Sequence, residues 1–294
     1  MVLRQVGGKT GFDLADVLAP SAIVPGPRRR LSRSRQVAIG VLFPLLVVAA
    51  WTILSASGAI PEQRLPPPVD VVRSARDFVV APSRPPVPGV VPFRGAAGEH
   101  ARASIGRWAE GYAIGLGVGL PLGLSLGLSK WISPALDPLF QAYRAVPITA
   151  WLPIALVWFG LGEGAARFLV FVGAVSPIVV ATADSTSRVP RQLVDTARML
   201  GTRQRDLARR VYLPAALPGI VTGLRLGLTL GWTSVIVAEL TGTTRGLGAM
   251  MFSAREVSRL DQIIVGMAAF AIIGLVGDLL LRAVTRPLVR WADA

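Results

Sequence analysis

Hydrophobic positions along the chain gather into six long segments, separated by polar or proline-rich stretches. These segments lie at about 37–57, 105–128, 134–159, 166–186, 215–240 and 262–286. A helix needs roughly 20 apolar residues to cross the hydrocarbon core of a bilayer, and each segment has about that length. The pattern therefore predicts an all-α polytopic membrane protein with six transmembrane helices.

Glycine and proline predict the local geometry of two of these segments. Pro147 and Pro153 interrupt the third segment, so its helix should kink or break there. The second segment is rich in glycines, several of them four residues apart, which lets a neighbouring helix approach closely. These glycines are Gly111, Gly115, Gly117, Gly119, Gly123 and Gly127.

The stretches between the segments predict how the chain is organised. Residues 58–103 contain many prolines, which excludes a spanning helix through most of that stretch. We expect it outside the cell, and we expect residues 188–214 to form a cytoplasmic loop. The predicted regions are a cytoplasmic tail at 1–36, a first transmembrane helix at 37–57, an external segment at 58–103, a transmembrane core at 104–288 and a cytoplasmic tail at 289–294.

Composition supports a membrane protein. Of the 294 residues, 52% are hydrophobic and 16% are charged, and the mean hydropathy is +0.55. Soluble domains carry about 25% charged residues, so the shortage of charge indicates contact with lipid. The chain has no cysteine, which excludes a disulfide framework or a cysteine nucleophile.

The net charge of +14 could indicate nucleic acid, but the arginines stand at the ends of the apolar segments. The excess of Lys and Arg in cytoplasmic loops of membrane proteins explains that placement without a nucleic-acid partner. It predicts that both termini and the arginine-rich 188–210 segment lie in the cytoplasm. We therefore expect a multi-pass membrane protein in contact with lipid.

The polar loop carries the most informative motif. It reads Asp195-Thr196-Ala197, then Gly201, then Val211-Tyr212-Leu213-Pro214. Gly201 should divide the loop into two short helices, the first with Leu193, Ala197 and Leu200 on one face. Taken alone, such an element could lie on the anionic inner leaflet with its arginines facing the lipid.

The spacing of this motif resembles the coupling loop of bacterial importer permeases of the ATP-binding-cassette (ABC) class. Their pattern is Glu-Ala-Ala, three residues, Gly, nine residues, Ile, one residue and Leu-Pro. Here Asp195 replaces Glu, Thr196 replaces the first Ala and Val211 replaces Ile, whereas Ala197, Gly201 and Leu213-Pro214 are unchanged.

A second resemblance narrows the family. The runs 144–153 and 156–162, together with 214–218, 223–225 and 237–240, are similar to the permeases of the sulfonate, taurine and nitrate import group. The two resemblances together cover roughly residues 100–290. The tail at 1–36 carries none, and the external segment looks longer than is usual in the family.

The resemblance implies a role for each matching residue. Asp195 would make a polar contact with an ATPase subunit, although it is one methylene shorter than Glu. Ala197 would pack against that subunit, Gly201 would permit the turn, and Leu213-Pro214 would return the chain to the membrane. The implied assembly has two permease copies, two ATPase subunits docked at 188–210 and an external solute-binding protein.

The resemblance also implies that ATP and Mg bind the ATPase and that this chain binds no cofactor. Gly8-Lys9-Thr10 matches the end of a phosphate-binding loop, but the position of its leading glycine is occupied by Leu3. Energy would therefore come from a partner or from an ion gradient. A gradient-driven secondary transporter is the rival hypothesis, yet the sequence shows neither repeated halves nor paired midplane carboxylates.

Charged residues inside the apolar segments are candidates for function, because burying them is costly. We expect Arg225 either to face the substrate pathway or to bond another helix, and Arg144, Trp232 and Glu239 are further pathway candidates. Asp278 is placed to pair with Arg282 one helical turn later.

Two expectations concern the remaining chemistry. His100 is the only histidine and lacks a nearby carboxylate, so we expect it at the surface without a catalytic role. The expected substrate is a small anion such as an aliphatic sulfonate, taurine or nitrate. A neutral or cationic solute such as a pyrimidine precursor is the alternative.

Overall fold

The structure, a computed structural model, describes residues 33–82, 91–129, 132–240 and 242–290. The predicted tail at 1–36, including Gly8-Lys9-Thr10, and the last four residues of the predicted tail at 289–294 therefore lie largely outside the described residues. Every element assigned among the described residues is a helix. The chain divides into two units, residues 1–50 and 51–294, and each is described by itself.

In the first unit, the described residues form the start of helix α2 (Arg33–Ala56). All side chains from Gly40 to Ala50 are exposed, among them Phe43 with 70% of its surface accessible. This apolar helix coincides with the first predicted transmembrane segment.

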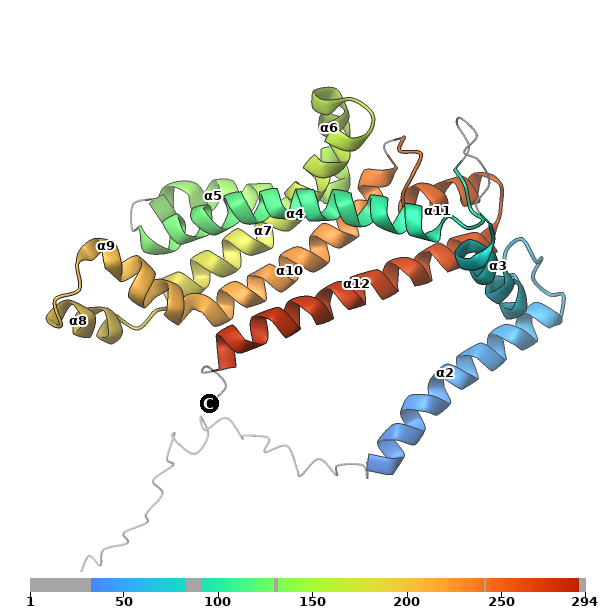
Figure 1. The fold of residues 1–294 in the computed structure, drawn as a ribbon, viewed down its shortest axis with the longest axis horizontal. Coiled ribbons are helices and arrows are strands. Elements are labelled where there is room, and N and C mark those ends of the chain that lie inside the picture. Colours follow the sequence, from blue (N-terminus) through green and yellow to red (C-terminus); the bar gives the residue numbers. More distant parts are fainter. Residues whose placement is uncertain (1–32, 83–90, 130–131, 241, 291–294) are drawn as a thin grey trace, which may run out of the picture. The chain divides into compact units, whose positions relative to one another are not determined.

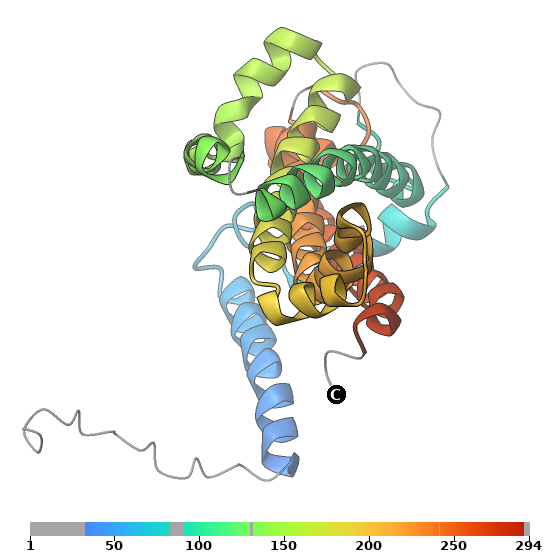
Figure 2. The same ribbon diagram turned by 90° about the vertical axis from the view of Figure 1, so that its left-hand side faces the viewer.

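Three long helices form the centre of the second unit: α4 (Ala97–Leu128), α7 (Glu163–Ser187) and α10 (Leu213–Glu239). Helix α12 (Leu260–Val289) packs beside α10, and the four helices run along one bundle (Figures 1 and 2). Tyr112, Ala174, Ile178 and Leu228 form a buried cluster where α4, α7 and α10 meet.

The glycines of α4 bring it very close to α7, as predicted. A Cβ added to Gly111 would lie 2.6 Å from the Cβ of Val170, and one added to Gly123 would lie 2.6 Å from the Cβ of Thr182. Gly117 is the exception, because an added Cβ there would have no heavy atom within 4 Å. The other close approaches are Gly115 to Ala174, Gly119 to Ile178 and Gly127 to Thr186.

The third predicted span is broken at Pro147, which confirms the prediction of a kink or break. Helix α5 (Ile132–Ala145) ends before this proline, and the short η1 (Ile148–Trp151) leads into α6 (Leu152–Phe159). The two halves, Pro138–Ala145 and Ile148–Phe159, meet at 94° (Figure 2).

Short helices lie at both ends of the bundle (Figure 1). Helices α3 (Pro68–Val80) and α11 (Leu247–Glu256) share a buried cluster with the start of α12, formed by Phe78, Leu247, Met250 and Val265. The polar loop forms α8 (Arg191–Met199), α9 (Gln204–Leu207) and the π-helix η2 (Ala208–Tyr212).

Helix α4 begins at Ala97, earlier than the predicted residue 105.

Four described helices are long and apolar enough to cross a membrane, and the bent pair makes five. The four are Ala97–Leu128, Glu163–Ser187, Ala208–Glu239 and Leu260–Val289. The apolar helix Gly40–Ala56 is shorter than these. The all-α membrane fold is therefore confirmed, whereas the count of six spans stays a prediction.

Candidate functional site

Helix α8 is fixed to the end of the bundle by Val194 and by the partly buried Ala197, which packs on the bundle cluster although the resemblance implied that it packs against an ATPase subunit. Val194 is only 4% exposed and packs in a cluster with Val189 before the helix, Leu207 after it and Ala216 and Ile220 of α10. Pro190 caps the start of α8, where a proline loses no helical hydrogen bond. Local sequence thus ends one helix and starts the next, and Val194 sets the orientation of α8.

Gly201 ends α8 in a left-handed conformation. Its φ is +82°, its N–H donates to the carbonyl of Arg198 at 2.9 Å, and the N–H of Thr202 donates to the carbonyl of Ala197 at 3.0 Å. This pair of bonds is the Schellman motif, which favours glycine because other residues are strained at positive φ. A Cβ at Gly201 would meet nothing within 4 Å, so the backbone angle alone requires the glycine.

The side of α8 that is turned away from the bundle is uncovered and carries two leucines. Leu193 is 51% exposed and Leu200 is 81% exposed, and Asp195 and Thr196 are exposed on the same helix. Within the described part of the chain, Asp195 pairs with Arg198 of its own helix, at 3.3 Å. A short helix with exposed leucines and a solvent-facing carboxylate at the tip of the bundle has the make-up of a contact surface.

The second half of the loop differs from the prediction of a separate short helix. Helix α9 continues through η2 into α10, so the long helix does not begin at Leu213-Pro214. In η2 the N–H of Leu213 donates to the carbonyl of Ala208, five residues earlier. Pro214 has no N–H and crowds the preceding turn, and a π-turn is one way in which a helix accommodates such a residue. Val211 is partly buried in the same cluster as Val194.

Arg225 makes the helix–helix contact that was one of its two predicted roles. Its guanidinium binds Asp278 of α12 at 3.0 Å and 3.4 Å. Asp278 also accepts from Arg282 at 2.8 Å, which confirms the predicted pair one turn apart. Trp232 is likewise held between α10 and α12, because its indole N–H donates to the carbonyl of Phe270 and its ring stacks on that residue at 4.4 Å.

Glu239 lies inside a network of charged groups that the sequence did not predict. Its side chain is completely buried, and it accepts from Arg107 at 2.8 Å, Ser104 at 2.6 Å and the N–H of Gly248 at 2.6 Å. Arg107 also binds both carboxylate oxygens of Glu163, at 2.6 Å and 2.8 Å. The network ties α4, α7 and α10 to the first turn of α11, which gives Glu239 a packing role.

The expectation that His100 lies at the surface is wrong. Its side chain is fully buried beside the same network, where Nδ1 accepts from the N–H of Gly246 at 2.9 Å and Nε2 donates to the carbonyl of Pro92 at 2.6 Å. The ring also stacks on Phe78 at 6.1 Å. Two backbone partners satisfy both nitrogens, which explains why burial needs no carboxylate.

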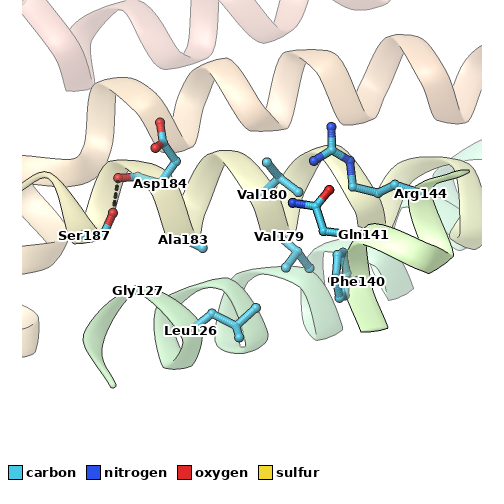
Figure 3. A pocket seen from close by; sticks show the side chains of 10 residues that line it. All are labelled: Leu126, Gly127, Phe140, Gln141, Arg144, Val179, Val180, Ala183, Asp184 and Ser187. Atoms are coloured by element: carbon cyan, nitrogen blue, oxygen red, sulfur yellow. Dashed lines mark hydrogen bonds between the residues drawn. The ribbon is translucent and has the colours of Figure 1, made fainter. Parts of the chain in front are cut away.

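Arg144 is the one predicted pathway residue that borders open polar space. A cavity of about 260 Å³ runs between the end of α4, α5 and α7, with Arg144 and Gln141 at one end and Asp184 and Ser187 at the other (Figure 3). A second cavity of about 290 Å³ lies between the break at Pro147 and helices α7 and α10, and it is also lined by Arg144. No described carboxylate pairs with Arg144.

The second cavity adds polar groups that sequence reasoning missed. Ser176 of α7 and Thr233 and Ser234 of α10 line it, opposite Tyr143 and Trp151 of the broken span. The sequence gives a signal for one of them, since Thr233 stands one helical turn after Thr229 in an otherwise apolar segment. The pairing of Arg107 with Glu239 could not be predicted from the sequence, because the two residues are 132 positions apart.

Comparisons with known proteins identify the family. Residues 118–293 match the family described as binding-protein-dependent transport system inner membrane component. The chain is 32% identical to the putative aliphatic sulfonates transport permease protein SsuC of Bacillus subtilis, over 87% of this chain and 88% of that protein. It is 36% identical to the taurine transport system permease protein TauC of Escherichia coli, over 53% of this chain and 57% of that protein.

A solved structure shares the fold. It is described as inward facing conformations of the MetNI methionine ABC transporter, and it aligns with a TM-score of 0.51 and 22% identity, covering 62% of this chain and 93% of that chain. The family match spans more than half of the sequence and includes the loop with Gly201 and the broken helix at its start. The chain therefore belongs to the binding-protein-dependent transport system inner membrane component family, and it is a multi-pass membrane permease of an ABC importer.

Proposed function

We propose that α8 is the coupling helix through which a separate ATPase subunit drives this permease. The observation that carries the proposal is the exposed side of α8, with Leu193 and Leu200 uncovered at the tip of a bundle whose other end is closed by the Arg107 network. Asp195 offers a carboxylate beside these leucines for a polar contact with the ATPase. ATP and Mg²⁺ bind the ATPase in this proposal, and the permease performs no chemistry.

Val194 and Gly201 would make α8 a transmitter of motion. Val194 joins α8 to Ile220 of α10 through one buried cluster, so a displacement of α8 is passed to a membrane-spanning helix. The left-handed turn at Gly201 fixes where the chain reverses. ATP-driven closure of two ATPases would then shift the permease between outward-open and inward-open states, a two-state equilibrium biased by the partner.

The proposed assembly contains two copies of this chain, two ATPase subunits and an external solute-binding protein. Its proposed location is the bacterial inner membrane, with six spans and with both termini and 188–213 in the cytoplasm. The arginine-rich composition of the α8 region supports that orientation. Residues 58–103 and 241–261 then lie outside.

A pair of matched substitutions tests the ATPase contact. Leu200→Glu places a charge on the exposed side of α8, and Leu161→Glu places the same charge at an equally exposed leucine on the turn before α7. We expect co-purification of the ATPase to be lost with Leu200→Glu and retained with Leu161→Glu, while both variants insert normally. Retention with Leu200→Glu would show that α8 is not the docking element.

We further propose that the substrate is a small anion, with a sulfonate or taurine ahead of nitrate. Relatives named for aliphatic sulfonates, taurine and bicarbonate support this class. Arg144, which pairs with none of the described carboxylates, supplies a cation beside two cavities. The exposed third of Arg225 supplies a second cation, partly neutralised by Asp278. A cation lowers the cost of moving an anion through a region of low dielectric constant.

Uptake by variants of Arg144 tests the substrate class. Arg144→Gln should reduce uptake of radiolabelled taurine or an alkanesulfonate, whereas Arg144→Lys keeps the charge and should retain most of it. Arg225→Gln should reduce the stability of the complex, because it leaves Asp278 with Arg282 alone. Equal uptake by all Arg144 variants would favour the alternative, a neutral or cationic solute.

A further inference from the structure

Helix α3 has two opposite edges of different chemistry. Asp70 and Val72 are two residues apart, as are Asp77 and Val79, and two residues correspond to about 200° around a helix of 3.6 residues per turn. The carboxylates therefore follow one edge and the valines the other. Both valines are uncovered, with Val72 at 68% and Val79 at 65% exposure.

The face between these edges anchors α3 to the bundle. Phe78 is 2% exposed, and Val71 and Ala75 pack with it in a cluster that also contains Val265 of α12. The hydroxyl of Ser74 donates to Asp261 in the first turn of α12. Helix α3 is thus held at the level where the spanning helix α12 begins (Figure 1).

The edge of α3 that carries Asp70 and Asp77 faces water and therefore points away from the membrane. Asp70 and Asp77 line a cavity of about 420 Å³ together with Glu62 and with Arg259, which immediately precedes α12. Arg259 and Asp261 form an ion pair at 2.7 Å at this cavity. So many charged groups around one open space indicate that it is filled with water.

The valine edge must then point the other way, towards the deeper turns of α12. Val265, Ala269 and Phe270 of α12 contribute to the cluster under α3, and each lies further along the span than Asp261. Beyond them the outward side of α12 is apolar, with Ile272 61% and Leu275 60% exposed. The valine edge continues this apolar surface, which faces lipid because α12 spans the membrane.

From this arrangement we propose that α3 is an interfacial helix, with Val72 and Val79 inserted into the bilayer and Asp70 and Asp77 in water. Arg76 lies between the two edges, where its long side chain can place its charge among lipid phosphates, whereas Arg73 pairs with Asp70 at 3.0 Å beside the water-filled cavity. A helix of this kind lies in the plane of the interface, with its apolar edge about 5–10 Å into the boundary of headgroups and acyl chains. In the orientation of the proposed function this is the outer leaflet.

Insertion would give α3 a mechanical role in the importer. Since Phe78 and Ser74 hold α3 to α12, the bilayer would resist any tilt of the outer end of α12 during transport. The segment before α4 would thus be a membrane contact rather than a free external loop. Helix α3 lies at the opposite end of the bundle from α8, so its contact with lipid can be tested separately from the ATPase contact (Figure 1).

The absence of cysteine from the chain makes a direct test possible. Single cysteines at Val72 and Val79 would carry a nitroxide spin label in the full-length chain, purified with its ATPase and placed in nanodiscs of phosphatidylethanolamine and phosphatidylglycerol. The measurement compares collision rates of each label with oxygen, which concentrates in lipid, and with a water-soluble nickel chelate. A label at Glu62 provides the aqueous reference, and one at Leu279, 52% exposed on α12, provides the lipid reference.

We expect the ratio of oxygen to nickel collisions at Val72 and Val79 to match that at Leu279 and to exceed that at Glu62. A ratio like that of Glu62 would place the edge in water and overturn the proposal. Labels that are immobilised and protected from both reagents would also overturn it, because protein would then cover the edge. Using two positions guards against one label disturbing α3.

Discussion

Replacing glycines on α4 provides a sharp test of the packing, because the same helix offers a matched control. An added methyl at Gly123 would lie 2.6 Å from the Cβ of Thr182 and 2.7 Å from the carbonyl oxygen of Val179, whereas ordinary contact begins at 3.4 Å. A backbone carbonyl cannot rotate away, so α4 and α7 must separate. At Gly117 the same methyl would meet nothing within 4 Å.

The two substitutions should therefore change stability in opposite directions. Gly123→Ala forces extra volume into a packed contact, which typically costs about 1–3 kcal/mol. Gly117→Ala removes only the backbone freedom of glycine in a helix, which stabilises by roughly 0.5–1 kcal/mol. The free energy of unfolding of each purified variant, followed by far-ultraviolet circular dichroism in mixed micelles, measures the difference.

Uptake adds a second readout. Gly123→Ala should slow transport as well as weaken the fold, because α4 and α7 border the cavity with Arg144. Gly117→Ala should transport as well as the unaltered protein. Equal shifts in unfolding free energy for the two variants would refute the close approach of α4 and α7 at Gly123.

Three further predictions address other parts of the molecule. Gly201→Val should abolish uptake and ATPase co-purification, whereas Gly201→Asn should retain both, because a left-handed conformation costs about 1–2 kcal/mol for most residues and less for Asn. Equal loss in the two variants would show that the positive φ of Gly201 is not what matters. Arg107→Met should lower the free energy of unfolding by about 3–5 kcal/mol, because it leaves the buried carboxylate of Glu239 unpaired. Glu163→Gln should lower it less, because the Glu163 side chain is 51% exposed, and the yield of folded protein measures this ranking. Single cysteines at Glu62 and Ser187 should react with an impermeant maleimide from opposite sides of the membrane, and reaction from one side would contradict the topology.

The parts of the fold that the sequence predicted well depend on local geometry. Gly111, Gly123 and their neighbours share a helix face because they are four residues apart, and Pro147 breaks its helix through its own ring and missing N–H. Gly201 is similar, since a left-handed turn is a property of one residue. Such features require no knowledge of what else in the chain comes near.

The parts that were missed depend on contacts between distant segments. Arg107 finds Glu163 and Glu239 across 56 and 132 residues, and no spacing in the sequence indicates those pairs. The partners of His100 are not evident in the sequence because both are backbone groups, which every residue carries. Arg225 stood out as a charge in an apolar span, but only the packing of α12 shows that Asp278 receives it.

The same reasoning explains the candidate site. The motif predicted where α8 and its turn lie, because the identity and spacing of Asp195, Ala197 and Gly201 specify a short helix and its end. It did not predict that Val194 would face the bundle and leave Leu193 and Leu200 uncovered. The orientation of α8 depends on its packing against Ile220 of α10. The π-helix η2, which leads from the loop into α10, is also not evident from the sequence pattern.

Transport energetics test the central claim most directly. The measurement is uptake, by proteoliposomes holding this chain with its ATPase, of the solute carried by its external binding protein. ATP is supplied only on the side of the membrane on which α8 lies, with ionophores present or absent. We predict uptake that stops when a non-hydrolysable analogue replaces ATP and continues when ionophores collapse every ion gradient. Uptake that continues without ATP and stops with the ionophores would contradict an ATP-driven importer coupled through α8.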